Sequence, residues 1–499
     1  MEQPSTEKYK RVPYLFAKKH GIVVTDAAES PTASVYYLPE TASLAALTEV
    51  KRLLDKPLQL HAVTPTEFQQ HLAQVYQSDS SIIDAAEGME EDLDLLKLAG
   101  QFPSSEDLLD TQDDAPIIRL INALFTQAIK QKASDIHIET YEDRILVRNR
   151  IDGVLQEILE IQRMIAPLVI SRVKVMAKLD IAEKRIPQDG RISLRLGGHN
   201  IDVRVSTLPS NHGERIVLRI LDQQSAQLDL NILGMPAHTL EQTRSLIAQP
   251  YGILLVTGPT GSGKTTSLYA MLRELNQVSR NILTIEDPIE YDLPGIGQTQ
   301  VNNKVEMSFA KGLRAILRQD PDIVMIGEIR DLETAEIAVQ ASLTGHLVLS
   351  TLHTNSALGA ITRLQDMGVE SFLISSSIIG LLAQRLVRML CPHCKEPHPM
   401  TPHERDLLNF TGTHETFIYH PKGCDHCNFN GYKGRTGIYE LIMVDDTFRS
   451  MIHHHESYQT METYLRPKTL SIRQDGFRRV LEGDTTIAEI LRVTSEMST

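Results

Sequence analysis

The chain has 499 residues, which is too long for a single hydrophobic core and predicts two to four domains. Hydrophobic residues make up 41% of it and charged residues 23%, and no apolar run approaches the roughly 18 to 20 residues that a membrane-spanning helix needs. The sequence also begins without an apolar stretch and a small-residue cleavage site, so we expect a cytoplasmic protein.

Residues 1–80 are expected to form a small mixed domain. It begins with the basic, partly aromatic stretch KYKRVPYLFAKKHGIVV. Two interpretations stay open for this stretch. It is either a solvated surface around a short helix, or a docking face for a protein partner or an anionic membrane surface.

Residues 81–114 are predicted to be an acidic linker. Between Asp84 and Asp114 there are eleven acidic residues and one basic residue, Lys97. This segment therefore carries most of the net charge of −14. Such a composition favours a solvated connection between domains. The overall acidity therefore says little about partners, but no basic stripe or nucleic-acid motif is present either, and we expect no nucleic-acid partner.

Residues 115–230 are expected to form an α+β second domain. An amphipathic helix, PIIRLINALFTQAIKQK, is followed by the alternating strands SDIHIE, RILVRNRI, RISLRL and IDVRVS. Asp152-Gly153 and Gly197-Gly198 lie between such strands, which predicts two hairpins.

Residues 231–499 change to a strand–helix alternation, which predicts a parallel sheet with crossover helices. The expected strands are ILLVTG, NILTIED, DIVMIGE and HLVLSTL. The apolar run Phe372–Leu386 contains serines and a glutamine, and we expect it to be a buried helix.

A phosphate loop is the most specific motif in the chain. Gly258–Thr265 follows a predicted strand and precedes a predicted helix, as this motif requires. Backbone N–H groups of such a loop converge on phosphates, Lys264 reaches the β- and γ-phosphates, and Thr265 offers its hydroxyl to Mg²⁺. The predicted ATP-binding residues are Gly258, Pro259, Thr260, Gly261, Ser262, Gly263, Lys264, Thr265 and Thr266.

Carboxylates follow two of the other predicted strands. Glu328 ends DIVMIGE, where an acid near a phosphate loop organises Mg²⁺ together with Thr265. Glu286, Asp287 and Glu290 surround the proline that follows NILTIED. Because the ends of parallel strands share one edge, we expect this strand to end beside the phosphate loop. Glu290 is our candidate general base, with Glu286 and Asp287 supporting metal and loop geometry, although the three roles are interchangeable on sequence grounds.

His346 and His353 frame the strand HLVLSTL, which is expected to lie beside the nucleotide. A histidine near a strand is more often structural than catalytic. Their placement favours a role as γ-phosphate sensors or as residues that couple the nucleotide to the rest of the protein.

The four cysteines form two CxxC pairs, Cys391/Cys394 and Cys424/Cys427. In a reducing cytoplasm this pattern predicts a structural Zn²⁺ site of four thiolates rather than disulfides. The long spacer between the pairs predicts a small inserted module, over residues 388–432.

These motifs together resemble the family of type II secretion system traffic ATPases. The resemblance is carried by GPTGSGKTT, ILTIEDPIEYDLPGIGQTQVN, GLRAILRQDPDIVMIGEIRD, LTGHLVLSTLHTN and CPHC…CDHC, and by KVMAKLDIAEKRIPQDGRISLR in the second domain. It implies a RecA-like ATPase domain over 231–499, preceded by a PAS-like α+β domain. It also implies an enzyme that hydrolyses ATP to power pseudopilus assembly and protein export across the outer membrane.

The resemblance further implies a homohexamer on the cytoplasmic face of the inner membrane. Its expected partners are the cytoplasmic domain of a single-pass (GspL-like) inner-membrane protein, which binds the N-terminal domain, and an inner-membrane platform (GspF-like) protein. Arginines are expected to bring positive charge to the γ-phosphate, and for Arg204 a plain surface charge is the alternative. The candidates are Arg204, Arg219, Arg314, Arg318, Arg330, Arg363 and Arg435.

Three other functions remain open at this point. A type IV pilus assembly ATPase shares most of these motifs, including the paired cysteines. A DNA-translocating motor predicts a basic stripe and salt-sensitive binding. A nucleotide-gated scaffold with negligible turnover predicts that Glu290→Gln changes nothing.

Overall fold

The fold is that of a computed structural model of the chain. It describes Val12, Ala17, 20–25, 33–54, 57–65, 67–68, His71, 115–196, 199–221, 228–412 and 416–494. Two compact units contain these residues, 1–224 and 225–499. Within the described ranges no helix is long and apolar enough to cross a membrane. The predicted acidic linker 81–114 and most of the basic N-terminal stretch lie outside the described residues.

The N-terminal part is a small α/β fold. The strand β2 (Ala33–Tyr37) pairs antiparallel with β1 (Ile22–Thr25) and parallel with β3 (Leu58–Ala62), and α2 (Leu44–Leu54) connects β2 to β3. Buried aliphatic side chains of the strands, with Ala46 and Val50 of the helix, form its core.

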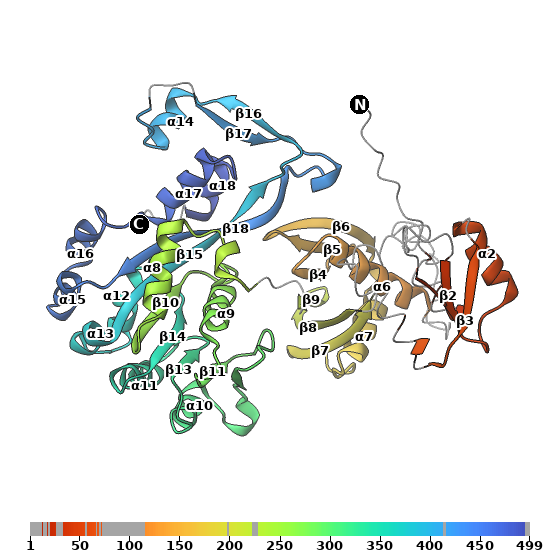
Figure 1. Cartoon of the computed structure of the whole chain (residues 1–499), viewed down its shortest axis with the longest axis horizontal. Helices are drawn as coiled ribbons and strands as arrows, with labels where there is room; N and C mark the ends of the chain where they lie inside the picture. Colours follow the sequence, from red (N-terminus) through yellow and green to blue (C-terminus); the bar gives the residue numbers. More distant parts are fainter. Residues whose placement is uncertain are drawn as a thin grey trace. The chain divides into compact units, whose positions relative to one another are not determined.

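The second domain is a six-stranded antiparallel sheet with two helices (Figure 1). Its strand order is β6-β5-β4-β9-β8-β7. The predicted amphipathic helix is α6, in which Ile117, Leu120, Ile121, Leu124 and Ile129 are buried. Both predicted hairpins are present, as β5–β6 and β7–β8. Its elements are α6 (Ala115–Lys130), β4 (Asp135–Thr140), β5 (Arg144–Ile151), β6 (Val154–Gln162), α7 (Ala166–Met176), β7 (Gln188–Leu196), β8 (His199–Ser210) and β9 (Gly213–Leu221).

The second unit is built on a seven-stranded sheet of order β12-β11-β13-β14-β10-β15-β18. All its strands run parallel except β18. The four predicted strands are confirmed as β10, β11, β13 and β14. The bounds of the sheet strands are β10 (Gly252–Thr257), β11 (Ile282–Glu286), β12 (Gly297–Gln300), β13 (Ile323–Ile326), β14 (Leu347–Leu352), β15 (Ile378–Leu390) and β18 (Tyr432–Met443).

Helices cover both faces of this sheet, as a mostly parallel sheet requires. On one face α8 (Ala237–Ile247) and α9 (Lys264–Leu275) pack against Leu254 and Val256 of β10. On the other face a larger core includes Ile253 and Leu255 of the same strand. The helices of that core include α10 (Phe309–Ile316), α11 (Leu332–Leu343), α12 (Gly359–Asp366) and α13 (Ser371–Ser377).

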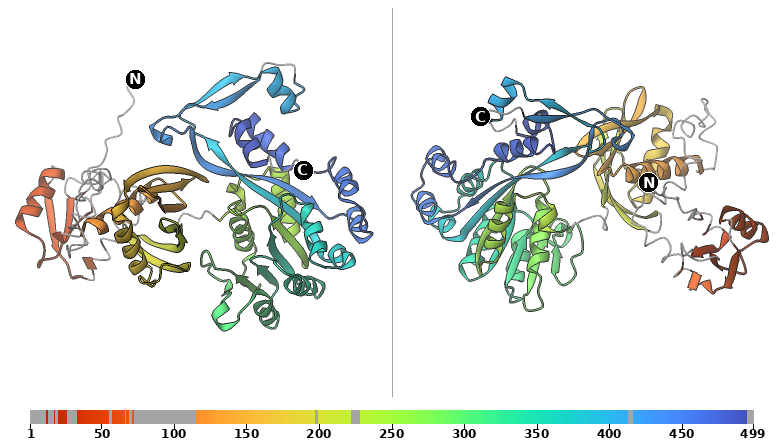
Figure 2. Two further views of the ribbon diagram at one scale, coloured as in Figure 1. Left: turned by 180° about the vertical axis from the view of Figure 1, so that it is seen from behind. Right: turned by 45° about the horizontal axis from the view of Figure 1, so that its top comes forward.

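The segment between β15 and β18 forms a module that extends from the sheet (Figure 2). It contains the antiparallel pair β16 (Lys395–Pro399) and β17 (Phe417–Pro421), the helix α14 (Pro402–Leu407) and a 3-10 turn at Asp425–Cys427. The chain then ends in α15 (Asp446–His453), α16 (Tyr458–Leu465), α17 (Ile472–Leu481) and α18 (Ile487–Thr494).

Two expectations about this sheet were wrong. The run Phe372–Leu386 is not one helix, because α13 ends at Ser377 and Ile378 begins the strand β15. Both faces of this strand are buried, because Leu381 and Ala383 belong to one core and Leu382 to the other. Its apolar run therefore lacks alternation and resembles that of a buried helix. In addition, β11 does not end beside the phosphate loop, because β14 and β13 lie between it and β10.

Candidate nucleotide site and cysteine cluster

The phosphate loop connects β10 to α9. Gly258, Gly261 and Gly263 have φ angles of 145°, 81° and 86°, which favour glycine. A Cβ at Gly258 would lie 2.4 Å from the carbonyl oxygen of Gln384, so only glycine fits there. Ser262 Oγ is buried and has no hydrogen-bond partner within the described structure, as expected of a group that faces a phosphate.

Lys264 closes this loop upon itself. Its Nζ donates to the carbonyl oxygens of Gly258, at 2.7 Å, and Pro259, at 3.2 Å. Burial lowers the pKa of Lys264 to about 8, although Glu328 partly opposes this effect. Thr265 is exposed at the start of α9. The loop therefore presents a cation, a free buried hydroxyl and an exposed hydroxyl to the space where phosphates bind in this motif.

The strand β15 supports the loop from its other side. Gln384 is 2% exposed and its Oε1 accepts a hydrogen bond from Ser267 Oγ of α9, at 2.7 Å. The neighbouring Arg385 is also buried and donates to Asn355 Oδ1 at 3.3 Å. Sequence reasoning missed both residues. The signal was a Gln-Arg pair that interrupts the apolar run GLLAQRL, where a buried strand tolerates polar groups only if they are paired.

The strands β14 and β13 bring two predicted residues to the same edge. His353 directly follows β14, which pairs with β10, and Glu328 follows β13, which pairs with β14. His353 Nε2 lies 3.3 Å from Glu328 Oε2, and Arg330 donates to Glu328 Oε1. Burial and the nearby Lys264 ammonium lower the pKa of His353. Lys264, His353 and Glu328 thus form one electrostatic cluster.

Asp287 and Glu290 lie farther along this edge, after β11. Asp287 is exposed and its Oδ2 is 4.0 Å from Arg330 Nη1, which links it to Glu328. Glu290 is half-buried, and its backbone N–H donates to the Tyr269 hydroxyl of α9 at 3.2 Å. This hydrogen bond attaches the loop that carries Glu290 to the phosphate-loop helix.

Glu286 is 3% exposed, and protein groups occupy both of its carboxylate oxygens. Tyr269 donates to Oε2, while Thr284 Oγ1, at 2.5 Å, and Gln298 Nε2, at 3.1 Å, donate to Oε1. Burial beside this carboxylate raises the pKa of Tyr269 far above its usual range, so the hydroxyl keeps its proton. The expected support of a metal ion by Glu286 would therefore require displacement of at least one of these donors.

His346 lies at the opposite end of β14 from His353. Its carbonyl oxygen accepts from the N–H of Gly252, the first residue of β10, and its ring Nδ1 is 2.8 Å from the carbonyl oxygen of Ala341. Within one subunit, His353 lies at the edge of the sheet that carries the phosphate loop, whereas His346 lies at the opposite edge. A six-residue strand separates the two ends by about 20 Å, because each residue of a strand advances about 3.3 Å.

The remaining arginine candidates lie in several different places. In the second domain Arg204 of β8 is directly opposite Arg219 of β9, and Arg191 of β7 is directly opposite Arg204. Arg219 Nε donates to Asp135 Oδ1 at 3.0 Å. In the second unit Arg314 pairs with Glu333 at 2.6 Å, Arg318 Nη1 donates to the carbonyl oxygen of Arg314, Arg363 lies in α12 and Arg435 in β18.

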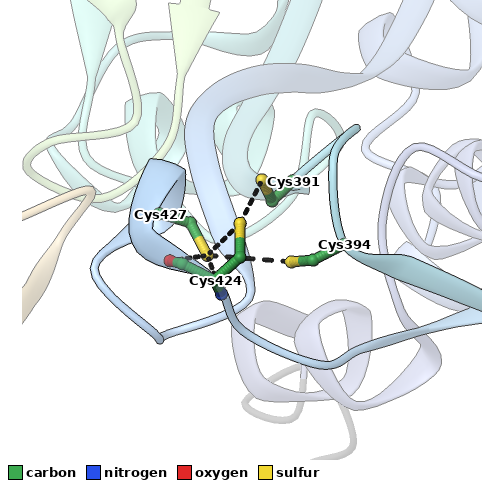
Figure 3. A group of neighbouring side chains, drawn as sticks. All are labelled: Cys391, Cys394, Cys424 and Cys427. Carbon is green, nitrogen blue, oxygen red and sulfur yellow. Dashed lines mark hydrogen bonds between the residues drawn. The ribbon is translucent and has the colours of Figure 1, made fainter.

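The four cysteines meet where β15 ends and the module begins and ends (Figure 3). The Sγ atoms of Cys391 and Cys424 are 3.9 Å apart, and those of Cys394 and Cys427 are 3.8 Å apart. Tetrahedral coordination with Zn–S distances of about 2.3 Å places sulfur atoms about 3.8 Å apart. The backbone N–H groups of Cys424 and Gly431 donate to Cys427 Sγ, as they would to a thiolate. The cluster fits Zn²⁺.

The His393 and His426 rings stack at 4.2 Å beside this cluster. The ligand atoms that lie close enough together to share one metal ion at this site are the four cysteine sulfur atoms. The two histidines are thus neighbours of the cysteine cluster rather than members of it.

A phosphate loop at the carboxyl edge of a mainly parallel sheet, with a carboxylate at the end of a nearby strand, defines a P-loop ATPase with a RecA-like fold. The crystal structure of the pilus retraction motor PilT with bound ADP is similar to this chain, with 26% sequence identity and a TM-score of 0.50. The match covers 74% of this chain and 95% of the PilT chain. The DotB ATPase of Legionella pneumophila, at 22% identity and a TM-score of 0.54, covers 75% of this chain and 95% of its own and shares the fold.

The family can be stated from two sequence models and from full-length relatives. Residues 110–492 match the model described as "Type II/IV secretion system protein", and residues 11–76 match a model of an N-terminal domain of "GSPII protein E". Type II secretion system protein E of Dickeya dadantii is 58% identical, and each chain is covered to 97%. Type II secretion system ATPase E of Vibrio cholerae is 56% identical, with 98% of each chain covered. The chain belongs to the type II/IV secretion system protein family and is an ATP-hydrolysing enzyme of type II secretion.

Proposed function

We propose that this chain hydrolyses ATP as a homohexamer to drive pseudopilus assembly, and thereby protein export across the outer membrane. The observation that carries the proposal is the gathering of Lys264, His353 and Glu328 at the carboxyl ends of three neighbouring strands. A purely structural phosphate loop needs no titratable cluster of this kind beside it.

The residues of this edge take distinct roles in the proposal. Bound ATP would supply the phosphoanhydride bond, and Mg²⁺ would supply positive charge to balance the charge that develops on the phosphates. Lys264 turns from its two carbonyl acceptors to the phosphates, and Gly258–Thr266 hold them through backbone N–H groups. Thr265 and Glu328 would hold the metal ion. Glu290 orients the attacking water and takes its proton, with Asp287 fixing the loop through Arg330.

His353 is proposed to report the state of the γ-phosphate. It lies beside Glu328, the Lys264 ammonium lowers its pKa, and its side chain is half exposed, so it can contact a ligand without unfolding its strand. His346 is not part of this proposal within one subunit, because it lies at the other end of β14.

Arg204 and Arg219 are proposed to bring positive charge to the γ-phosphate. Like charges directly opposite each other on a sheet destabilise it, and Arg191, Arg204 and Arg219 form such a row over three strands. A row of this kind is expected where an anion is to be bound. Arg219 has a carboxylate partner in Asp135 and Arg191 has one in Asp202, and both Arg204 and Arg219 remain candidates for direct contact.

The other parts of the chain are assigned to attachment. The N-terminal domain is proposed to bind the cytoplasmic domain of a single-pass inner-membrane protein, and the hexamer to meet an inner-membrane platform protein. The chain would then work in the cytoplasm, on the inner face of that membrane. Zn²⁺ held by Cys391, Cys394, Cys424 and Cys427 is proposed to stabilise the module, and no vacant ligand position supports a catalytic role for it.

The test combines turnover with export in the native host. Lys264→Ala should weaken nucleotide binding, whereas Glu328→Gln should retain nucleotide and lose more than about 100-fold in phosphate release. Both variants should abolish export of the host's secreted enzymes when they replace the wild-type chain. Glu336→Gln, an exposed change on α11, is the charge-matched control.

Phosphate release tests the assigned catalytic site, and export tests which assembly the ATPase drives. Normal phosphate release by Glu328→Gln would contradict the assigned site. Loss of turnover with unaffected export, and with loss of surface pili instead, would transfer the same chemistry to a pilus assembly motor.

A further inference from the structure

The module carries a second cluster of metal-binding side chains at some sequence distance from its cysteines. His398 lies in β16 and His420 in β17, and His398 is directly opposite Ile418. Because residues two apart share a face of a strand, His398 and His420 are diagonal neighbours on one face of this hairpin. Glu404, in the first turn of α14, completes the group.

The three side chains converge on one point. His398 Nε2 is 3.0 Å from His420 Nε2, and it is 3.2 Å and 3.3 Å from the two carboxylate oxygens of Glu404. One ligand atom from each residue lies within 4.8 Å of the others. The His398 and His420 rings are stacked, with centroids 3.7 Å apart.

Protons alone do not satisfy this arrangement. His398 Nε2 has either one hydrogen or one lone pair in the plane of its ring. With a hydrogen it can donate to Glu404 or to His420, and with a lone pair it can accept only from His420. Each choice leaves one of the two close contacts unmade. A cation between the three residues satisfies all of them, because both imidazoles and the carboxylate then act as ligands.

Hydrogen bonds from Thr401 also fix the orientation of the Glu404 carboxylate. Glu404 Oε2 accepts from the backbone N–H and the Oγ1 of Thr401, each at 2.8 Å, in the capping box of α14. Such outer contacts fix the orientation of a ligand and are typical of metal sites. They leave Oε1 directed at His398 Nε2.

We propose that His398, Glu404 and His420 form a second metal site, which binds a first-row divalent ion of the Zn²⁺ class. Two imidazoles and one carboxylate are borderline ligands that suit Zn²⁺, Co²⁺ and Ni²⁺ better than Mg²⁺ or Ca²⁺. Three protein ligands leave a coordination position for water. The site joins both strands of the hairpin to α14, and it differs from the cysteine cluster in both ligand type and openness.

The experiment measures metal content of the full-length, tag-free chain. After equilibration with micromolar Zn²⁺ and removal of free metal, plasma mass spectrometry should find two zinc ions per wild-type chain. His398→Asn/His420→Asn should retain one. His403→Asn/His454→Asn removes two exposed histidines outside the cluster and should still hold two.

Cobalt distinguishes the two sites by spectroscopy. Co²⁺ bound to the four cysteines gives intense thiolate charge-transfer bands, whereas Co²⁺ at a histidine–carboxylate site does not. The double variant should keep those bands and lose one equivalent of bound Co²⁺, which also reports that its module is folded. One zinc ion per wild-type chain at saturation would overturn the proposal, as would equal metal content in the wild type and both double variants.

Discussion

Tyr269, in the helix that follows the phosphate loop, donates a hydrogen bond to the buried carboxylate of Glu286 at the end of β11. The same hydroxyl accepts from the backbone N–H of Glu290. A single side chain therefore connects the phosphate-loop helix to the loop of the proposed general base, over two intervening strands of the sheet.

Tyr269→Phe should lower kcat for ATP by about 10- to 100-fold while leaving the KM for ATP almost unchanged, because Glu290 would be misplaced by a fraction of an ångström and the phosphate loop would not. Loss of one donor to buried Glu286 should also lower the free energy of unfolding by about 1 to 3 kcal/mol. Steady-state kinetics and denaturant unfolding measure the two effects. Tyr251→Phe, at an exposed tyrosine, is the control. An unchanged kcat in Tyr269→Phe would mean that the hydrogen bonds of Tyr269 contribute to stability but not to catalysis.

Substitution of Glu286 and of Glu290 by glutamine should have different effects on catalysis and on stability. Glu290→Gln should lower kcat by about 10² to 10⁴ with little change in Tm, because its side chain is only half-buried. Glu286→Gln should lower Tm, since its new amide would place a donor against Tyr269, Thr284 or Gln298. Phosphate release and calorimetry give the two readouts. Equal kinetic losses in both variants would mean that the roles of the two acids are not divided as proposed.

Nucleotide binding should take up protons above pH 8. Burial lowers the pKa of Lys264 from 10.5 to about 8 in the empty site, and contact with phosphates should restore it. At pH 7 the ammonium is already charged, so little uptake is expected, whereas at pH 9 close to one proton per site should be taken up. Titration calorimetry in buffers of different ionisation enthalpy measures this number.

The same shift fixes the sign of a stability effect. Between about pH 8 and pH 10.5 the unfolded chain holds the Lys264 proton more tightly than the folded chain, so this group makes folding more favourable as the pH rises. Lys264→Arg stays charged throughout and should show neither proton uptake nor the stability trend. Uptake of the same size at pH 7 and pH 9 would contradict the assignment to Lys264.

Arg204→Gln should lower kcat by about 10³-fold or more if this residue acts on the transition state, because a true arginine finger contributes that much. The folded domain should be unaffected or slightly stabilised, since the change removes a positive charge that lies opposite Arg191 and Arg219 in the strand register. Arg191→Gln is the matched control from the same row of the sheet. Comparable activity of the Arg204 and Arg191 variants would mean that Arg204 is a surface charge without a role in catalysis.

Much of the nucleotide site could be predicted because it depends on contiguous residues. The Gly258–Thr265 motif, its strand and its helix are local features, and each is present as expected. The apolar strands β10, β13 and β14 were equally visible, since runs of β-branched and aliphatic residues are typical of parallel strands buried on both faces. The cysteine cluster was also predictable, because its ligand spacing limits the geometry.

The errors come from information that is not local. Strand order is a property of the whole sheet, so the ending of β11 at a distance from the phosphate loop was not visible in NILTIED. Glu286 shows the same limit, because nothing near it in sequence reveals that Tyr269 and Gln298 will occupy its oxygens. The strand β15 was mistaken for a helix because it is apolar on both faces and shows no alternation.

The course of β15 has a mechanical consequence. One uninterrupted strand begins inside the sheet, contacts the phosphate-loop helix through Gln384 and ends at Leu390, next to Cys391. Seven residues of extended chain measure about 23 Å, so a tilt of about 5° at Gln384 moves the cysteine cluster by about 2 Å. From Gly380 to Leu390 this strand is also paired with β18, with a register shift between Arg388 and Leu390. A rearrangement of the phosphate loop that tilts β15 would therefore displace the module.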